Sequence, residues 1–366
     1  TVEEAEEDVN YLFDAFYYDF AFYDYFGGHT VFDQAKAEIL QELQAKDSLT
    51  CKDLQEILVK HLTFIKDGHF NINHNFPAEK EIPFFFRQVM FVKTDSGYQD
   101  SKGKTVVSVD GYPDLDALFK RSISKEGYLV YYPVLLKEAK FDGTEWDKHV
   151  CDEQLTVHYA DGSTDVLTAD TWSQYYKDLP KGQNTDLRQT DGIPVFQFNH
   201  FDPSFLEETN DAAAQMSNAG VSMLDLRSNV GGYEEVAHQW INRYSRQRVL
   251  GNGVRYSVLS ASPSAQKASR ANNDNILILL SGKCSASSAE ITLDLSYNVE
   301  NSLIVGENTN GSMISNSGHI ELPNSKCSVD MTFSTVYLTP DGSDYFEELR
   351  GFFPDIWVPA KEAETL

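Results

Sequence analysis

Short apolar runs alternate with segments of helical periodicity in the second half of this 366-residue chain, and this alternation constrains the fold most. The strand-like runs lie at 195–198, 222–226, 276–280 and 303–305, with a later β-type run at 329–338. The helical patterns lie at 203–219, 234–244 and 286–297. Such alternation is typical of βαβ units built on a largely parallel sheet. We therefore expect an α/β domain over residues 185–366.

The first seventy-five residues have a pattern typical of helices. An aromatic-rich helical segment ends at Gly27-Gly28, and a second helical segment covers 32–45. Thr50 and Asp53 have the spacing of a capping box at the start of a third segment. The sequence thus predicts a helical N-terminal unit over 1–75.

The middle of the chain changes to short β-type runs separated by turn-forming Asp-Gly pairs. The runs lie at 84–92, 105–109 and 155–159. This pattern predicts a small β-rich module over 80–170. The polar stretch 172–189 reads as a linker or a surface crossing.

The charge balance excludes some classes of partner. Thirty Lys and Arg against 56 Asp and Glu give a formal net charge of −26, which disfavours binding to nucleic acid or to anionic lipid. The apolar runs are far shorter than the ~20 residues that span a bilayer, so we expect no membrane insertion. The first eight residues lack the features of a signal peptide, which leaves the compartment open on the residues alone.

The four cysteines, Cys51, Cys151, Cys284 and Cys327, are scattered without C-x-x-C spacing. We therefore expect neither a zinc site nor a redox dithiol, and no metal or cofactor. Cys284 and Cys327 are expected to be buried thiols, although one or two disulfides of undetermined pairing remain an alternative.

Two segments carry candidate chemistry, and each follows a strand and precedes a helix. Residues 225–232 end in Gly231-Gly232, where bare backbone can approach a ligand and N–H groups can hold a developing negative charge. A purely structural turn is the alternative. Residues 281–290 place Ser285, Ser287 and Ser288 at the second junction, where a serine is either an N-cap or a nucleophile.

At these residues the sequence resembles the S41 peptidases, the C-terminal processing or tail-specific proteases. The resemblance covers the second half of the chain through six ordered segments: 195–198, 225–232, 287–290, 306–311, 322–325 and 351–356. It implies a crotonase-like ββα catalytic domain. The stretch 103–118 is similar to the substrate-side module that is PDZ-like in many members. The overall expectation is an α/β (α+β multidomain) protein with a helical N-terminal unit and a degenerate PDZ-like module.

The resemblance also implies site residues. The nucleophile is the serine three residues before the helix glutamate Glu290, which is Ser287. One branch uses a lysine base at the position that here holds Ser312, so that Ser/Lys dyad is absent. The other branch, similar to the tricorn core proteases, uses a histidine and a late glutamate, which match His69 and Glu348. The oxyanion donors would be the backbone N–H groups of Gly231 and Ser288.

Each assignment has a rival in the sequence. His200 follows the 195–198 run and could line the cleft without acting as the base, and Glu347 stands beside Glu348. The histidine branch often has a serine before its histidine, whereas this chain has Gly68. The relay would then use another hydroxyl or water.

The resulting expectation is a bacterial, secreted or cell-surface serine endopeptidase that acts on a peptide or protein. Ser287 attacks, His69 moves the proton, and Glu348 orients His69. A catalytically impaired peptide-binding relative is the alternative. An acyl-CoA-handling crotonase relative fits less well, because the charge of −26 opposes a polyphosphate ligand.

Overall fold

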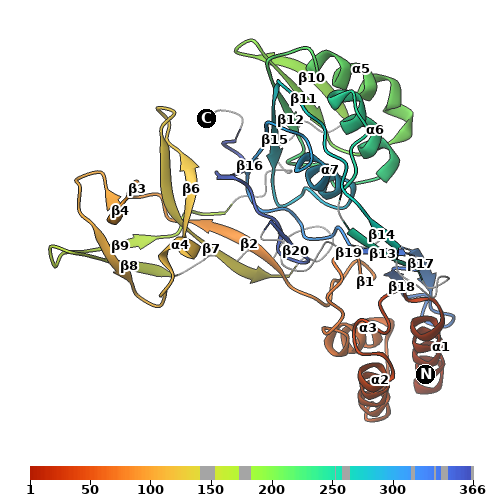
Figure 1. Cartoon of the computed structure of the whole chain (residues 1–366). Helices are drawn as coiled ribbons and strands as arrows, with labels where there is room; N and C mark the ends of the chain where they lie inside the picture. Colours follow the sequence, from red (N-terminus) through yellow and green to blue (C-terminus); the bar gives the residue numbers. More distant parts are fainter. Residues whose placement is uncertain are drawn as a thin grey trace.

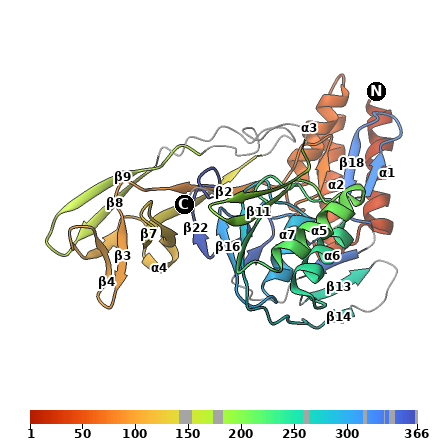
Figure 2. The same ribbon diagram turned by 90° about the horizontal axis from the view of Figure 1, so that it is seen from above.

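A computed structural model describes residues 1–140, 153–172, 183–251, 253–257, 264–314, 318–333, 335–338 and 345–363. A central sheet with helices carries a β-rich module on one side and the N-terminal helices on the other (Figures 1 and 2). The fold is mixed α/β. Among the described residues, no helix is long and apolar enough to cross a membrane.

The central sheet has six strands in the order β10-β11-β12-β15-β16-β22. Its first strand is antiparallel to its neighbour and the others run parallel. The strands are β10 (Thr185–Thr190), β11 (Ile193–Phe198), β12 (Val221–Asp225), β15 (Ile276–Ser281), β16 (Ser302–Gly306) and β22 (Ile356–Trp357). A short 3₁₀ helix, η2 (Pro203–Phe205), leads into the helices α5 (Leu206–Met216), α6 (Glu234–Ser245) and α7 (Ser288–Ser296). The carboxyl ends of β12 and β15 therefore lie side by side, which brings the two candidate segments together.

The N-terminal helices share an apolar core with the central domain. They are α1 (Val2–Asp19), α2 (Gly28–Gln44) and α3 (Cys51–His61). Buried Phe16, Phe32 and Leu58 on these helices belong to the same cluster as Phe198 and Leu293. The chain then forms β1 (Asn71–Ile72), which pairs with β18 (Ser328–Met331), and β18 pairs with β17 (Gly318–Glu321).

The β-rich module has its own apolar core. It contains β2 (Lys80–Phe85), β3 (Phe91–Thr94), β4 (Gly97–Asp100), β5 (Val106–Val109), α4 (Leu115–Leu118), β6 (Phe119–Ile123), β7 (Leu129–Ala139), β8 (Gln154–Tyr159) and β9 (Thr164–Thr168). The long pair β2 and β7 connects this module to the central domain (Figure 1). The remaining strands are β13 (Gly253–Ser257), β14 (Ser264–Gln266), β19 (Thr335–Leu338), β20 (Phe346–Glu347) and β21 (Gly351–Phe352).

The sequence patterns predicted most of these elements. The parallel strands and the helices of the second half are confirmed, and so is the Thr50–Asp53 capping box. The expected linker was wrong in part, because residues 185–190 form the edge strand β10. The β run 329–338 is two strands in different sheets. Cys284 and Cys327 are thiols, the first partly buried and the second buried, and Cys151 lies outside the described residues.

Candidate active site

Ser287 occupies a strained turn between β15 and α7. Its φ of 54° lies in the left-handed region that non-glycine residues rarely adopt. The neighbouring serines are committed to the backbone: the Ser285 hydroxyl donates to Leu226 O at 2.7 Å, and the Ser288 hydroxyl donates to Gly232 O at 2.7 Å. Ser285 is fully buried, whereas Ser287 is partly exposed. Of the three serines, Ser287 therefore has the position that a nucleophile requires.

The Gly231-Gly232 turn packs directly against Ser287. Gly231 has φ of 101°, and a Cβ there would lie 2.6 Å from the Ser287 Cβ, so the close approach requires glycine. The Gly231 N–H donates to Asn229 Oδ1 at 2.8 Å. The Gly231 carbonyl accepts from His200 Nδ1 at 2.6 Å. The His200 side chain therefore contacts the candidate site through the backbone carbonyl of Gly231.

The buried carboxylate of Glu290 joins the Ser287 turn to residues 309–312, which we call the 309–312 turn. Its Oε2 accepts from the N–H groups of Ser287 at 3.0 Å and Ser312 at 2.8 Å. Its Oε1 accepts from Gly311 N at 2.7 Å and from the Thr309 hydroxyl at 2.6 Å. Burial raises the pKa of the Glu290 carboxyl, and these donors oppose that rise. The glutamate is therefore an anchor for two loops.

His69 lies in a loop after α3 that packs on the 309–312 turn. Its side chain is 15% exposed, and its Nδ1 lies 3.9 Å from Oδ1 of the buried Asp67. The same Asp67 oxygen accepts from the His69 backbone N–H at 2.9 Å. Burial lowers the pKa of the His69 imidazole, and the Asp67 charge raises it. Burial is the larger effect, so the pKa lies below its ordinary value and the neutral imidazole, which can accept a proton, is favoured.

Glu348 and Glu347 have opposite environments. The Glu348 carboxylate is partly buried and accepts from the backbone N–H of Gly68 at 2.8 Å and from that of Met313 at 3.2 Å. Burial raises the pKa of this carboxyl well above its usual value. Glu347 is exposed and pairs with Arg350 at 2.6 Å. Of the two neighbours, only Glu348 contacts the loop that carries His69, and it does so through the residue before the histidine.

Two buried lysines at the 309–312 turn were not predicted from the sequence. Lys80, the first residue of β2, donates from Nζ to Ser312 Oγ at 2.7 Å. Lys283 donates to the Thr309 carbonyl at 2.6 Å. Burial lowers the pKa of Lys80 to about 8 and that of Lys283 to about 7. No sequence signal marks Lys80, because its position depends on how the β-rich module docks.

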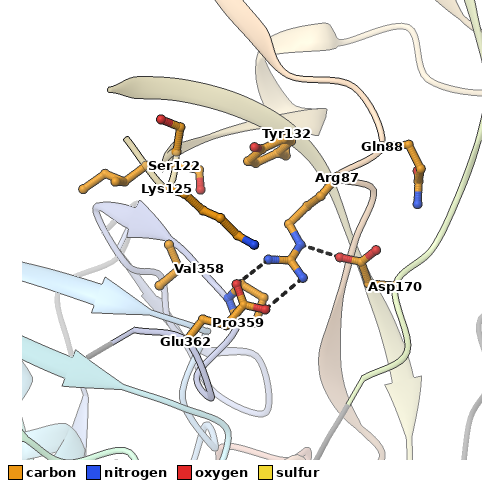
Figure 3. A pocket seen from close by; sticks show the side chains of 11 residues that line it. Arg87, Gln88, Ser122, Lys125, Tyr132, Asp170, Val358, Pro359 and Glu362 are labelled. Carbon is orange, nitrogen blue, oxygen red and sulfur yellow. Dashed lines mark hydrogen bonds and ion pairs between the residues drawn. The ribbon is translucent and has the colours of Figure 1, made fainter. Parts of the chain in front are cut away.

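A separate cavity of about 350 Å³ lies between the β-rich module and the C-terminal segment (Figure 3). Its lining contains neither Ser287, His69 nor Glu348. Arg87 lies on its wall, donates to Glu362 at 2.7 Å and also pairs with Asp170. These ion pairs fasten the module to the end of the chain. Across the described residues, no group of three or more His, Cys, Asp or Glu side chains could hold a metal ion.

Solved structures of other proteins are similar in fold to this chain. The chain is similar to mature CPAF, with 12% identity, a TM-score of 0.53, and coverage of 99% of this chain and 94% of that one. A structure of mature CPAF complexed with lactacystin gives 12% identity, a TM-score of 0.52, and coverage of 100% and 95%. The photosystem II D1 C-terminal processing protease gives 14% identity, a TM-score of 0.45, and coverage of 98% and 94%. At these identities, the likeness to CPAF shows a shared fold.

Comparison of the sequence with family models and with curated proteins gives two results. No curated protein matches the chain significantly. Residues 193–358 match the model of peptidase family S41, and this segment contains the Gly231-Gly232 turn, Ser287 and Glu348. Over residues 193–358, the chain is therefore similar to peptidase family S41.

Proposed function

We propose that this protein is a serine endopeptidase that cleaves peptides or proteins through an acyl-enzyme. The observation that carries the proposal is the Ser287 turn. It combines a left-handed backbone, a partly exposed side chain and a bare glycine against the serine, and it lies inside the segment that matches the model of a peptidase family. A hydroxyl held at such a turn is suited to nucleophilic attack.

In this mechanism His69 takes the proton of Ser287 and later gives it to the leaving amine. Asp67, 3.9 Å from the imidazole, stabilises the charge that forms there. Glu348 orients the base indirectly, because it holds the N–H of Gly68. The backbone N–H groups of Ser288 and Gly231 would stabilise the oxyanion. For Gly231 this requires its N–H to leave Asn229 Oδ1 or to share with it.

The finer assignments of fold and location are also proposals. We assign residues 185–366 to a crotonase-like catalytic domain, 80–170 to a degenerate PDZ-like module and 1–75 to a helical N-terminal unit. The similarity to peptidase family S41 supports an extracytoplasmic bacterial protein, and the net charge of −26 supports partners other than nucleic acid.

The test is covalent labelling of Ser287 by a fluorophosphonate, read by mass spectrometry, together with hydrolysis of an unstructured protein substrate. We expect labelling of the wild type, and neither labelling nor hydrolysis in Ser287→Ala. Ser285→Ala is the control for which serine is the nucleophile, since the Ser285 hydroxyl donates to Leu226 O. A wild type that binds peptides but is neither labelled nor able to hydrolyse them would support the impaired relative instead.

A further inference from the structure

Lys80 places a buried ammonium group at the contact between the His69 loop and the 309–312 turn. The residue is only 2% exposed. Nζ donates to the Gly68 carbonyl at 3.0 Å, to Ser312 Oγ at 2.7 Å and to Asn310 Oδ1. One acceptor thus belongs to the residue before His69, and the other two belong to the turn that Glu290 fastens to Ser287.

The start of β2 is also docked by contacts that do not involve the Lys80 ammonium. The next residue, Glu81, already fixes the start of the strand: its N–H donates to Leu349 O at 3.1 Å, and its carbonyl accepts from Asn308 Nδ2 at 3.0 Å. Its carboxylate pairs with Arg350 at 2.6 Å. Burial of an ammonium is costly, and the contacts of Glu81 hold the start of β2 separately from it. The buried position of the Lys80 amine therefore indicates a role in the candidate active site.

We propose that Lys80 is a positioning residue for the His69 base, because its ammonium ties the loop that carries His69 to the 309–312 turn. This inference rests on the proposed function. Glu348 holds the N–H of Gly68, and Lys80 holds its carbonyl, so the residue before the base is fixed on both sides. A Cβ at Gly68 would collide with Ser312 Oγ, which shows how tightly the two segments pack.

The charge of Lys80 acts on the base as well. The groups that influence His69 are Asp67 on its own loop, Asp330 on β18 and Lys80 on β2. The two aspartates raise the pKa of the imidazole, and Lys80 lowers it. The charges of Glu290, Glu348 and Asp67 raise the pKa of Lys80. The charge of Lys80 in turn lowers the pKa of Lys283. Removal of the ammonium should therefore leave His69 easier to protonate.

The test is Lys80→Met, which keeps an unbranched apolar side chain and removes the donors and the charge. We expect kcat to fall about 10- to 100-fold, the size of a lost charge-assisted hydrogen bond, with little change in KM. The acid limb of kcat against pH should move to higher pH. The control is Lys120→Met, which removes a half-buried ammonium on β6 of the β-rich module, 5.8 Å from the ring of Trp357 on β22. Its kcat and pH profile should equal those of the wild type.

A second readout does not depend on activity. NMR titration of the His69 imidazole, assigned by comparison with His69→Gln, should give a higher pKa in Lys80→Met than in the wild type. If Lys80→Met does not fold, Ser312→Ala removes one acceptor of the ammonium, and we expect a smaller loss of kcat. Unchanged kcat and unchanged His69 titration would overturn the proposal. An inactive wild type in which the titration still shifts would refute the peptidase function while leaving the contact between Lys80 and the His69 loop in place.

Discussion

Glu290→Gln is the sharpest test of how the site is held together. The carboxylate accepts from four donors, two on each oxygen. An amide keeps one oxygen, and its best orientation places that oxygen on the N–H groups of Ser287 and Ser312. The NH₂ group then faces Gly311 N and the Thr309 hydroxyl. The hydroxyl can rotate to accept, but the buried Gly311 N–H loses its acceptor.

An unpaired buried N–H costs about 1–3 kcal/mol. The two remaining bonds become neutral, which costs about 1 kcal/mol each. Relief of carboxylate burial offsets part of this sum, so we expect a loss of about 2–4 kcal/mol in the free energy of unfolding. Turnover should fall strongly, because the turn of Ser287 and the 309–312 turn are no longer fixed to each other.

The assay is urea unfolding followed by tryptophan fluorescence, with fluorophosphonate labelling of the folded protein at low urea. The control is Glu321→Gln, an exposed glutamate 3.3 Å from Lys326, where a surface pair contributes about 0–1 kcal/mol. If Glu290→Gln matched this control in both stability and labelling, the anchoring role of Glu290 would be refuted.

Four further predictions concern the site. His69→Ala should abolish turnover. Wild-type activity should rise with pH through an ionisation below the ordinary histidine value of about 6.5, because burial lowers the His69 pKa. A rise only near pH 8 would instead assign the base to a lysine such as Lys80. Asp67→Asn should move the acid limb of the pH profile of activity to still lower pH. A shift to higher pH would show that the Asp67 charge does not raise the His69 pKa. Gly231→Ala should abolish labelling, whereas Gly192→Ala, with φ of 83° and open space around it, should cost about 1–2 kcal/mol of stability and leave kcat unchanged. Glu348→Gln should lower kcat while Glu347→Gln should not; equal effects would show that the contact with Gly68 is irrelevant.

The sequence predicted the central domain well because its strands are short apolar runs bounded by helical periods, and that pattern has few other solutions. The strand β10 was missed because TDLRQT is polar and lies at the sheet edge, where one backbone side and much of each side chain face water. The two adjacent glutamates 347 and 348 were separated in the sequence only by resemblance. In the structure, the backbone donors around Glu348 and the ion pair of the exposed Glu347 with Arg350 distinguish them.

Lys80 could not be found from the chain alone, because no periodicity or spacing relates it to the 309–312 turn, 230 residues away. Its position results from the docking of β2, which depends on Glu81 and on the 348–350 loop. Long-range contacts between segments of this kind leave no local signal in a single sequence.

Two departures from the expected S41 pattern, Gly68 and Ser312, pack against each other, and both contact Lys80. Gly68 stands where a serine is common, and a Cβ there would collide with the Gly311 carbonyl and with Ser312 Oγ. Ser312 stands where a lysine would serve the other branch, and its short side chain leaves the volume that the Lys80 ammonium occupies. A lysine at 312 would bring a second ammonium beside Lys80, and a serine at 68 would displace the turn that Glu290 anchors. The two departures are therefore sterically compatible with each other, and with Lys80 they place a hydroxyl and a cation beside the residue that precedes His69.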